Sequence, residues 1–197
     1  MTVTATDYLW FEDRFPDLAE AYCFTLVNDL APSELLKRLN GEEHPALTGV
    51  TAVIEAAYDL GDTQQLVAMT GIGSWTLMIE PNGYLGVSEE RALPASAGTT
   101  WISHFCNING VDSFLWAEDA AMRLVFEPMF PDYRWGSTPD DQLETMRRVG
   151  FHFSTEEPEI DQSVAAAFAL TNVMTGVRLT PEILETATFA CGAVKIR

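Results

Sequence analysis

Apolar and polar positions follow a β-type pattern most clearly in the middle of the chain. Apolar, β-prone runs predict strands over residues 99–107, 111–118 and 121–126. Their connections, Ile108-Asn109-Gly110 and Asp119-Ala120, are too short for the crossover that parallel neighbours need. These three segments are therefore predicted to be consecutive antiparallel neighbours in one sheet.

Further strands are predicted earlier in the chain, over residues 21–27, 65–70 and 74–80. The glycines of Gly71-Ile72-Gly73 indicate a hairpin between the last two. Residues 188–196 are a candidate for a last strand.

Helices are predicted over residues 7–16, 32–41, 50–60, 88–93, 139–149, 164–174 and 181–186. Pro16 is expected to end the first of these helices, because the residue before a proline avoids the helical region, and Pro94 is expected to close the helix over 88–93. Thr138 is the expected N-cap of the helix over 139–149.

Together these elements predict an α+β fold. We expect an antiparallel sheet of five or six strands, packed against helices on one face, with a helical C-terminal extension. Residues 154–161 carry four acids and no base, which is typical of a linker. The expected organisation is a domain over 1–153, followed by this acidic linker and a helical extension over 154–197 that packs on the same domain.

The charge of the chain is strongly unbalanced. Its 197 residues include 29 acids and 11 bases, for a net charge of −18, while 47% are hydrophobic and can form a core. Such a surface repels nucleic-acid phosphates, so nucleic acid is excluded as an expected partner, and a basic protein is favoured.

Several features favour the cytoplasm. Cys23, Cys106 and Cys191 are odd in number and lie in apolar runs, which predicts free thiols rather than a disulfide framework. The first residues lack the basic and apolar regions of a signal peptide. No apolar run is long enough to span a bilayer, so no membrane association is expected.

No motif for nucleotide, cofactor or metal binding is present, and no cofactor or metal is expected. The best local arrangement is His104-Phe105-Cys106, because alternate residues of a strand share a face. His104 and Cys106 are interpreted either as a Cys–His pair or two metal ligands, or as a half-buried histidine beside a buried thiol in a central strand.

Glu80 ends an apolar strand and is the second candidate. It is interpreted either as a general base with a raised pKa or as a structural carboxylate. In the structural interpretation it accepts backbone N–H groups from the turn Pro81-Asn82-Gly83, or pairs with an arginine such as Arg123.

Arg134-Trp135-Gly136 is the third candidate, and it follows a proline-rich stretch. An arginine beside a tryptophan suits the rim of a binding surface. It equally suits a tryptophan folded over the sheet as a lid on the core. Trp75 is a further binding candidate, and the acids of 156–161 are interpreted either as a grip for a basic partner or as a solvated linker.

The order of several short motifs resembles that of DUF6461, a family of uncharacterised actinobacterial proteins. These motifs include Trp75-Thr76-Leu77-Met78-Ile79-Glu80-Pro81-Asn82-Gly83, Ser96-Ala97-Gly98-Thr99, Phe126-Glu127-Pro128 and Arg134-Trp135-Gly136. The resemblance covers about residues 7–149. It implies one compact α+β domain and no established activity.

The absence of a catalytic motif and the strong acidity favour a non-catalytic, cytoplasmic protein-binding domain. An immunity-type inhibitor or a regulatory adaptor would be typical. The alternative is a small enzyme or ligand-binding domain with a cleft around Glu80, His104 and Arg134. A deep pocket lined by these residues would favour the alternative, and a flat acidic face with exposed aromatics would favour protein binding.

Overall fold

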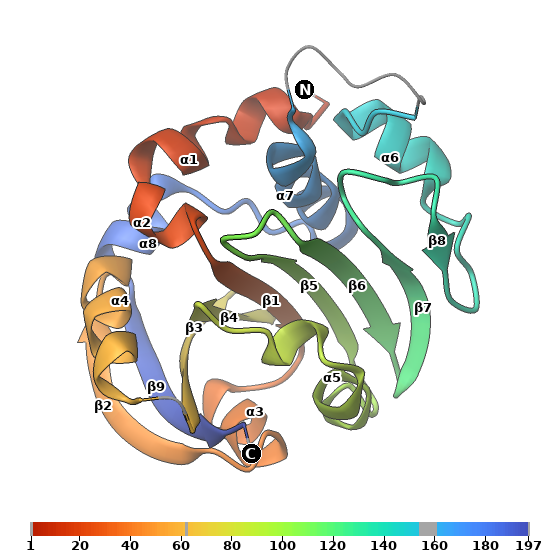
Figure 1. The fold of residues 1–197 in the computed structure, drawn as a ribbon. Helices are drawn as coiled ribbons and strands as arrows, with labels where there is room; N and C mark the ends of the chain where they lie inside the picture. The colour runs from red at the N-terminus through yellow and green to blue at the C-terminus, as the bar shows by residue number, and fades with distance from the viewer. Residues whose placement is uncertain (1, 62, 154–160, 197) are drawn as a thin grey trace.

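A large antiparallel sheet organises the chain in the computed structural model, which describes residues 2–61, 63–153 and 161–196 (Figure 1). Its nine strands in the described residues are β1 (Tyr22–Asn28), β2 (Glu42–Thr48), β3 (Gln64–Ile72), β4 (Trp75–Pro81), β5 (Thr100–Cys106), β6 (Asp112–Glu118), β7 (Ala121–Phe126), β8 (Arg134–Trp135) and β9 (Thr188–Lys195). They lie in the order β2-β9-β3-β4-β1-β5-β6-β7-β8.

Helices connect these strands. The α-helices are α1 (Trp10–Arg14), α2 (Pro16–Ala19), α3 (Pro32–Arg38), α4 (Val50–Asp59), α5 (Glu89–Ala95), α6 (Leu143–Val149), α7 (Ser163–Thr175) and α8 (Pro181–Thr186). Two 3-10 helices, η1 (Ala5–Tyr8) and η2 (Leu85–Val87), complete the described elements. The α+β class is confirmed.

The predicted meander is also confirmed. Strands β5, β6 and β7 are consecutive antiparallel neighbours. The hairpin of β3 and β4 forms as expected, with Ile72 opposite Trp75. Strand β1 pairs with both β4 and β5, so it lies at the centre of the sheet and joins the hairpin to the meander.

The expected count of five or six strands is wrong, because the sheet has nine. Strand β2 was not predicted because its sequence begins with two acids and contains a proline, residue types that are uncommon in strands. It forms an edge where Pro45 and a register shift between His44 and Leu47 limit further pairing. Strand β8 was missed because it is only two residues long, at the opposite edge.

Helices cover both faces of the sheet, not one face as expected. The first face carries Tyr22, Phe24 and Leu26, and it packs against η1, α1, α2, α4 and α6 to α8. The second face carries Val27, Met78 and Trp101, and it packs against α3, η2 and α5. Figure 1 shows these two groups of helices on opposite sides of the strands.

Three predicted helices differ in detail. The segment 7–16 is broken into η1, α1 and α2, and Pro16 begins α2 rather than only ending the helix before it. Pro94 lies inside the last turn of α5. The helix expected over 139–149 forms only from Leu143, so Gln142 is its N-cap instead of Thr138.

The C-terminal part is not purely helical. Strand β9 lies inside the sheet between β2 and β3, and α7 packs on the first face through Phe168. Residues 154–160, which hold most of the predicted acidic linker, lie outside the described residues.

Candidate functional site

Glu80, His104 and Arg134 do not lie in one cleft. Glu80 is opposite Cys23 in the pairing of β4 with β1, and Cys23 is opposite Phe105 in the pairing of β1 with β5. Glu80 therefore shares the second face with Phe105, while the adjacent His104 points to the first face. Arg134 lies in β8, four strands beyond β1 in the sheet.

The Glu80 carboxylate holds the segment that follows β4 against the second face. It is fully buried, and its two oxygens accept hydrogen bonds from the backbone N–H groups of Leu85 (2.8 Å) and Gly86 (2.9 Å). The donors thus belong to η2 rather than to the turn Pro81-Asn82-Gly83. Arg123 forms its ion pair with Glu118 at 3.6 Å, not with Glu80.

Burial dominates the titration of Glu80. It raises the pKa of the carboxyl from 4.5 to about 7, against the lowering effect of the Leu85 and Gly86 N–H groups. A raised pKa suits a general base, but the side chain is closed off from solvent. The two hydrogen bonds indicate a structural role for this side chain, which is to anchor η2 to the sheet.

A buried polar cluster surrounds this contact. The Thr25 hydroxyl lies 2.9 Å from the Ser103 hydroxyl, and the Trp101 indole donates to the Gly86 carbonyl at 2.8 Å. A Cβ on Gly86 would lie 2.1 Å from Thr25 Oγ1 and 2.7 Å from Cys23 Sγ. Glycine is therefore required for the close approach of η2 to the sheet.

His104 is enclosed by aromatic rings on the first face. Both ring nitrogens lie 3.4 Å from the Tyr22 hydroxyl, and the ring packs edge-on against Phe168. Burial lowers its pKa to about 3, so the imidazole is neutral near pH 7. His104 is fully buried rather than half-buried, and this environment favours a structural role.

Cys106 shares the first face with His104 but lacks the setting of a reactive thiol. Burial, with the negative charges of Asp112 and Glu12, raises its pKa to about 11, whereas nucleophilic thiols have lowered values. Among the residues that the structure describes, no group of three or more His, Cys, Asp or Glu is placed to hold a metal ion.

The space beside His104 is too small for a substrate. A cavity of about 20 Å³, lined by Tyr8, His104 and Phe168 among others, accommodates roughly one water molecule. The Tyr8 hydroxyl is buried there without a hydrogen bond of normal geometry, although the backbone of Leu179 faces it. Burial raises the pKa of Tyr8 to about 12.

Arg134 organises the loop on either side of β8. Its guanidinium contacts Asp140 Oδ1 through Nη2 (2.6 Å) and Nε (2.9 Å), and Nη1 donates to the Pro131 carbonyl at 3.1 Å. The side chain is largely covered. Arg134 is thus engaged within the protein and fixes the loop that presents its neighbours.

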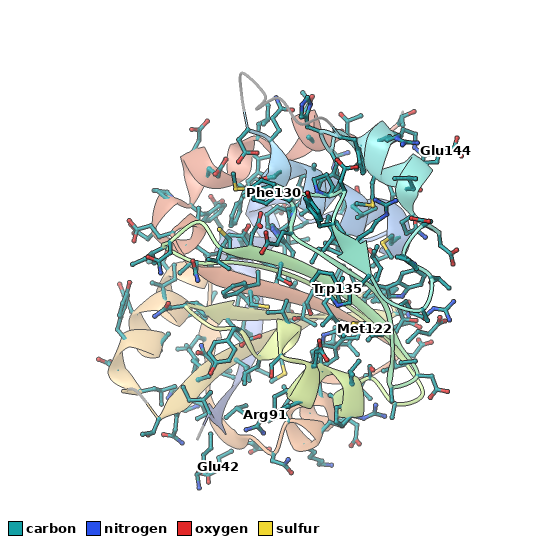
Figure 2. The ribbon with its side chains drawn as sticks, turned by 45° about the vertical axis from the view of Figure 1, so that its right-hand side comes forward. Glu42, Arg91, Met122, Phe130, Trp135 and Glu144 are labelled. Carbon is teal, nitrogen blue, oxygen red and sulfur yellow. The ribbon has the colours of Figure 1, made fainter. Side chains whose placement is uncertain are left out.

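Residues 129–135, here called the aromatic segment, expose large apolar side chains. Met129 is 48% exposed, Phe130 54%, Tyr133 77% and Trp135 52%. The interpretation of Trp135 as a lid on the core is therefore wrong. Both Phe130 and Trp135 lie on the side of the molecule that carries β7 and β8 (Figure 2).

The tip of the β5–β6 hairpin lies next to the aromatic segment. The backbone N–H of Met129 faces the carboxylate of Asp112, the first residue of β6. Ile108 and Val111, in the adjoining hairpin tip, are 74% and 52% exposed. Exposed apolar side chains from two neighbouring loops thus gather at one end of the sheet.

Trp75 does not join this group. It begins β4, opposite Asn28 of β1 and Ile72 of β3, and it packs partly buried against the core of the first face. Four strands of the sheet order separate β4 from β8.

The sequence motifs quoted for the resemblance lie in β4 and the turn after it, in the segment before β5, and at the β7–β8 edge; they include Glu80 and the residues that flank or end the aromatic segment. The model of a family of unknown function, DUF6461, matches residues 1–197. The chain belongs to this family. The match extends the expected range of 7–149 to include α7, α8 and β9.

Other comparisons add no relative. No curated protein and no solved structure matches the chain. Within the part of the chain that the structure describes, no helix is both long and apolar enough to cross a bilayer.

Sequence reasoning missed Met129, Phe130 and Tyr133 as surface residues. The stretch before Arg134 stands out in the sequence for its prolines, which indicate turns and say nothing of exposure. The sequence did offer one signal, which is the high density of large apolar side chains between Pro128 and Trp135. A loop that does not bury such side chains does not need them for its own stability, so their presence indicates a binding surface.

Proposed function

We propose that the protein is a non-catalytic binding protein that recognises a basic protein partner through the aromatic segment. The observation that carries this proposal is the exposure of Met129, Phe130, Tyr133 and Trp135 within seven consecutive residues. Aromatic and methionine side chains are enriched at protein interfaces, and exposed apolar groups of this kind are uncommon on surfaces that contact only water.

The loop is organised before any partner binds. The Arg134 contacts with Asp140 and Pro131 fix the backbone on both sides of Tyr133 and Trp135. The Phe130 carbonyl accepts the Tyr133 N–H at 3.0 Å, which closes a further turn. A preorganised surface loses less conformational entropy on binding.

Charge indicates the chemistry of the partner. Glu127, Asp132 and Asp141 are exposed around the aromatic segment, while its one base, Arg134, is already paired with Asp140. An apolar centre with an acidic surround complements a basic surface, and the net charge of −18 steers such a partner toward the protein. An immunity-type inhibitor or a regulatory adaptor fits this description.

The enzyme or ligand-binding alternative has less support. Its three residues lie on opposite faces and at an edge of the sheet, and Glu80 and His104 are both closed off from solvent. We further place the protein in the cytoplasm, as its three free cysteines suggest. The excess of arginine over lysine, nine against two, supports an actinobacterial source.

A photocrosslinking experiment tests the proposal. A benzophenone amino acid at position 133 is expected to capture a basic protein in the producing cell, and that protein is then purified. Phe130→Ser with Trp135→Ser should weaken its binding more than about tenfold, because hot-spot aromatics dominate interfaces. Tyr84→Ser, which removes an aromatic that is 48% exposed elsewhere, is the matched control. Equal weakening by both variants would contradict the proposal.

A further inference from the structure

A concave surface lies away from the aromatic segment, between helices that cover the first face of the sheet. A cleft of about 380 Å³ separates the α1–α2 region from α4 and is open to solvent. In Figure 1 these helices lie at the left of the molecule, whereas β8 lies at the right. The volume is within the range of pockets that bind drug-sized groups.

The floor of the cleft contains apolar side chains, while polar and charged groups line the rest of it. Phe15 and Val50 are buried beneath it, with 9% and 1% of their surfaces exposed, and Ile54 of α4 is partly exposed along the same floor. Pro16 begins α2 and separates it from α1, since a proline has no backbone N–H to continue the helical hydrogen bonding. The floor offers a surface for an aliphatic chain.

The rim of the cleft is acidic and its acids are free. Asp17 and Glu20 come from the α2 region and Glu55 from α4; all three are exposed, and none forms an ion pair within the described residues. The one base in the rim, Arg14, is paired with Glu185 at 2.7 Å. Tyr58, which is 76% exposed, adds an aromatic ring.

We propose that this cleft docks an arginine or lysine side chain carried by a segment of a protein partner. The aliphatic part of the side chain packs along Ile54, above the buried Phe15 and Val50, and its charged end faces the carboxylates of the rim. Tyr58 is available for a cation–π contact. The cleft is open to solvent between two helical segments, and in this proposal the peptide backbone stays outside it.

This site is separate from the aromatic segment, because α4 contacts β2, β3 and β4, whereas β8 forms the edge of the sheet beyond β5, β6 and β7. A protein with two separate docking surfaces can hold two segments at once. Two binding events linked in this way gain affinity through effective concentration.

The test uses the whole protein and a defined probe. The peptide acetyl-Gly-Leu-Arg-Leu-Gly-amide is titrated into isotope-labelled protein while backbone amide shifts are recorded by NMR. Saturable shifts are expected at residues 14–20 and 50–58. The double variant Glu20→Gln with Glu55→Gln should weaken binding at least about threefold, in line with two exposed charge contacts.

The control variant is Glu89→Gln with Glu90→Gln, which removes two exposed acids from α5 and leaves the cleft intact. It should bind the peptide as the parent does. Equal weakening in both variants would show attraction by overall charge alone and would overturn the proposal. A peptide with glutamine in place of arginine should not bind. Spermidine binding at the same amides without peptide binding would reassign the cleft to small cations and would also overturn it.

Discussion

The Glu80 carboxylate and the Gly86 backbone N–H are joined by a 2.9 Å hydrogen bond that ties η2 to the second face of the sheet. The contact spans six residues, and Glu80 bonds the Leu85 N–H as well. One buried side chain thus satisfies two backbone donors at the start of a 3-10 helix, where no intrahelical acceptor is available.

Replacing Glu80 by glutamine should lower the free energy of unfolding by an amount that depends on pH. Glutamine keeps one acceptor oxygen and turns an N–H₂ group toward a backbone donor, which costs about 1–3 kcal/mol. Burial raises the pKa of Glu80 from 4.5 to about 7, so the folded state favours the neutral acid, whose two oxygens still accept the two N–H groups. Its stabilising contribution is therefore complete below pH 4.5 and declines as the pH rises toward 7.

The measurement is urea denaturation of the parent and the Glu80→Gln protein at about pH 5 and about pH 8. The parent should exceed the variant by more at the lower pH, with the difference between the two pH values on the order of 2–3 kcal/mol. Subtracting one protein from the other cancels the titration of His104 and Asp112. A difference that grows with pH would contradict the burial effect.

Gly86→Ala should destabilise the protein by about 1–3 kcal/mol, because the new methyl group would overlap Thr25 Oγ1 and Cys23 Sγ in a closed space. Thermal unfolding followed by circular dichroism measures the change. Gly71→Ala is the control, since a Cβ there meets no atom within 4 Å. If the two variants unfold alike, the close packing of η2 on the sheet is not a source of stability.

Arg134→Lys should loosen the loop around β8 without unfolding the protein. Lysine keeps the charge but cannot contact both Asp140 and the Pro131 carbonyl as the guanidinium does. Hydrogen–deuterium exchange over residues 131–140 should become faster. The Arg91→Lys protein, which changes one exposed contact to the Lys195 carbonyl, should exchange in this loop like the parent.

Phe130→Ser and Trp135→Ser should each change the free energy of unfolding by less than about 0.5 kcal/mol, because both side chains are about half exposed. Trp101→Ser removes a fully buried ring that also donates to the Gly86 carbonyl, and it should cost about 3–5 kcal/mol. A large loss of stability at Trp135 would restore its interpretation as a lid on the core.

All three cysteines should react with a thiol reagent after denaturation without reductant. In the native protein Cys106 should react first, because it is only partly buried, and Cys23 should react last. Even Cys106 should be slow at neutral pH, since its pKa is raised to about 11. Recovery of a single thiol from the denatured protein would indicate a disulfide.

Local sequence information was sufficient for the meander and the β3–β4 hairpin, because the short connections between these strands allow one arrangement only. It failed at β2, where Glu42, Glu43 and Pro45 resemble a loop and pairing with β9 supplies the structure. When two strands pair from more than a hundred residues apart, the pairing itself leaves no alternation of apolar and polar residues in either strand by which it could be predicted.

The candidate site shows the same limit. A hydrogen-bonded role for the Glu80 carboxylate could be anticipated from its place at the end of a strand. The donors could not, because they belong to η2, and its position depends on the close packing of Gly86 against Thr25 of another strand. For Trp135, composition alone does not distinguish a residue that covers the core from one that faces solvent.

The position of β9 has a consequence for synthesis of the protein. Strands β3 and β2 emerge from the ribosome early, but the strand that separates them is made more than a hundred residues later. Until then the edge of β3 that later pairs with β9 presents unpaired backbone N–H and C=O groups to the cell. The nascent protein therefore has a long interval in which a chaperone, or a copy of itself, competes with its own last strand for that edge.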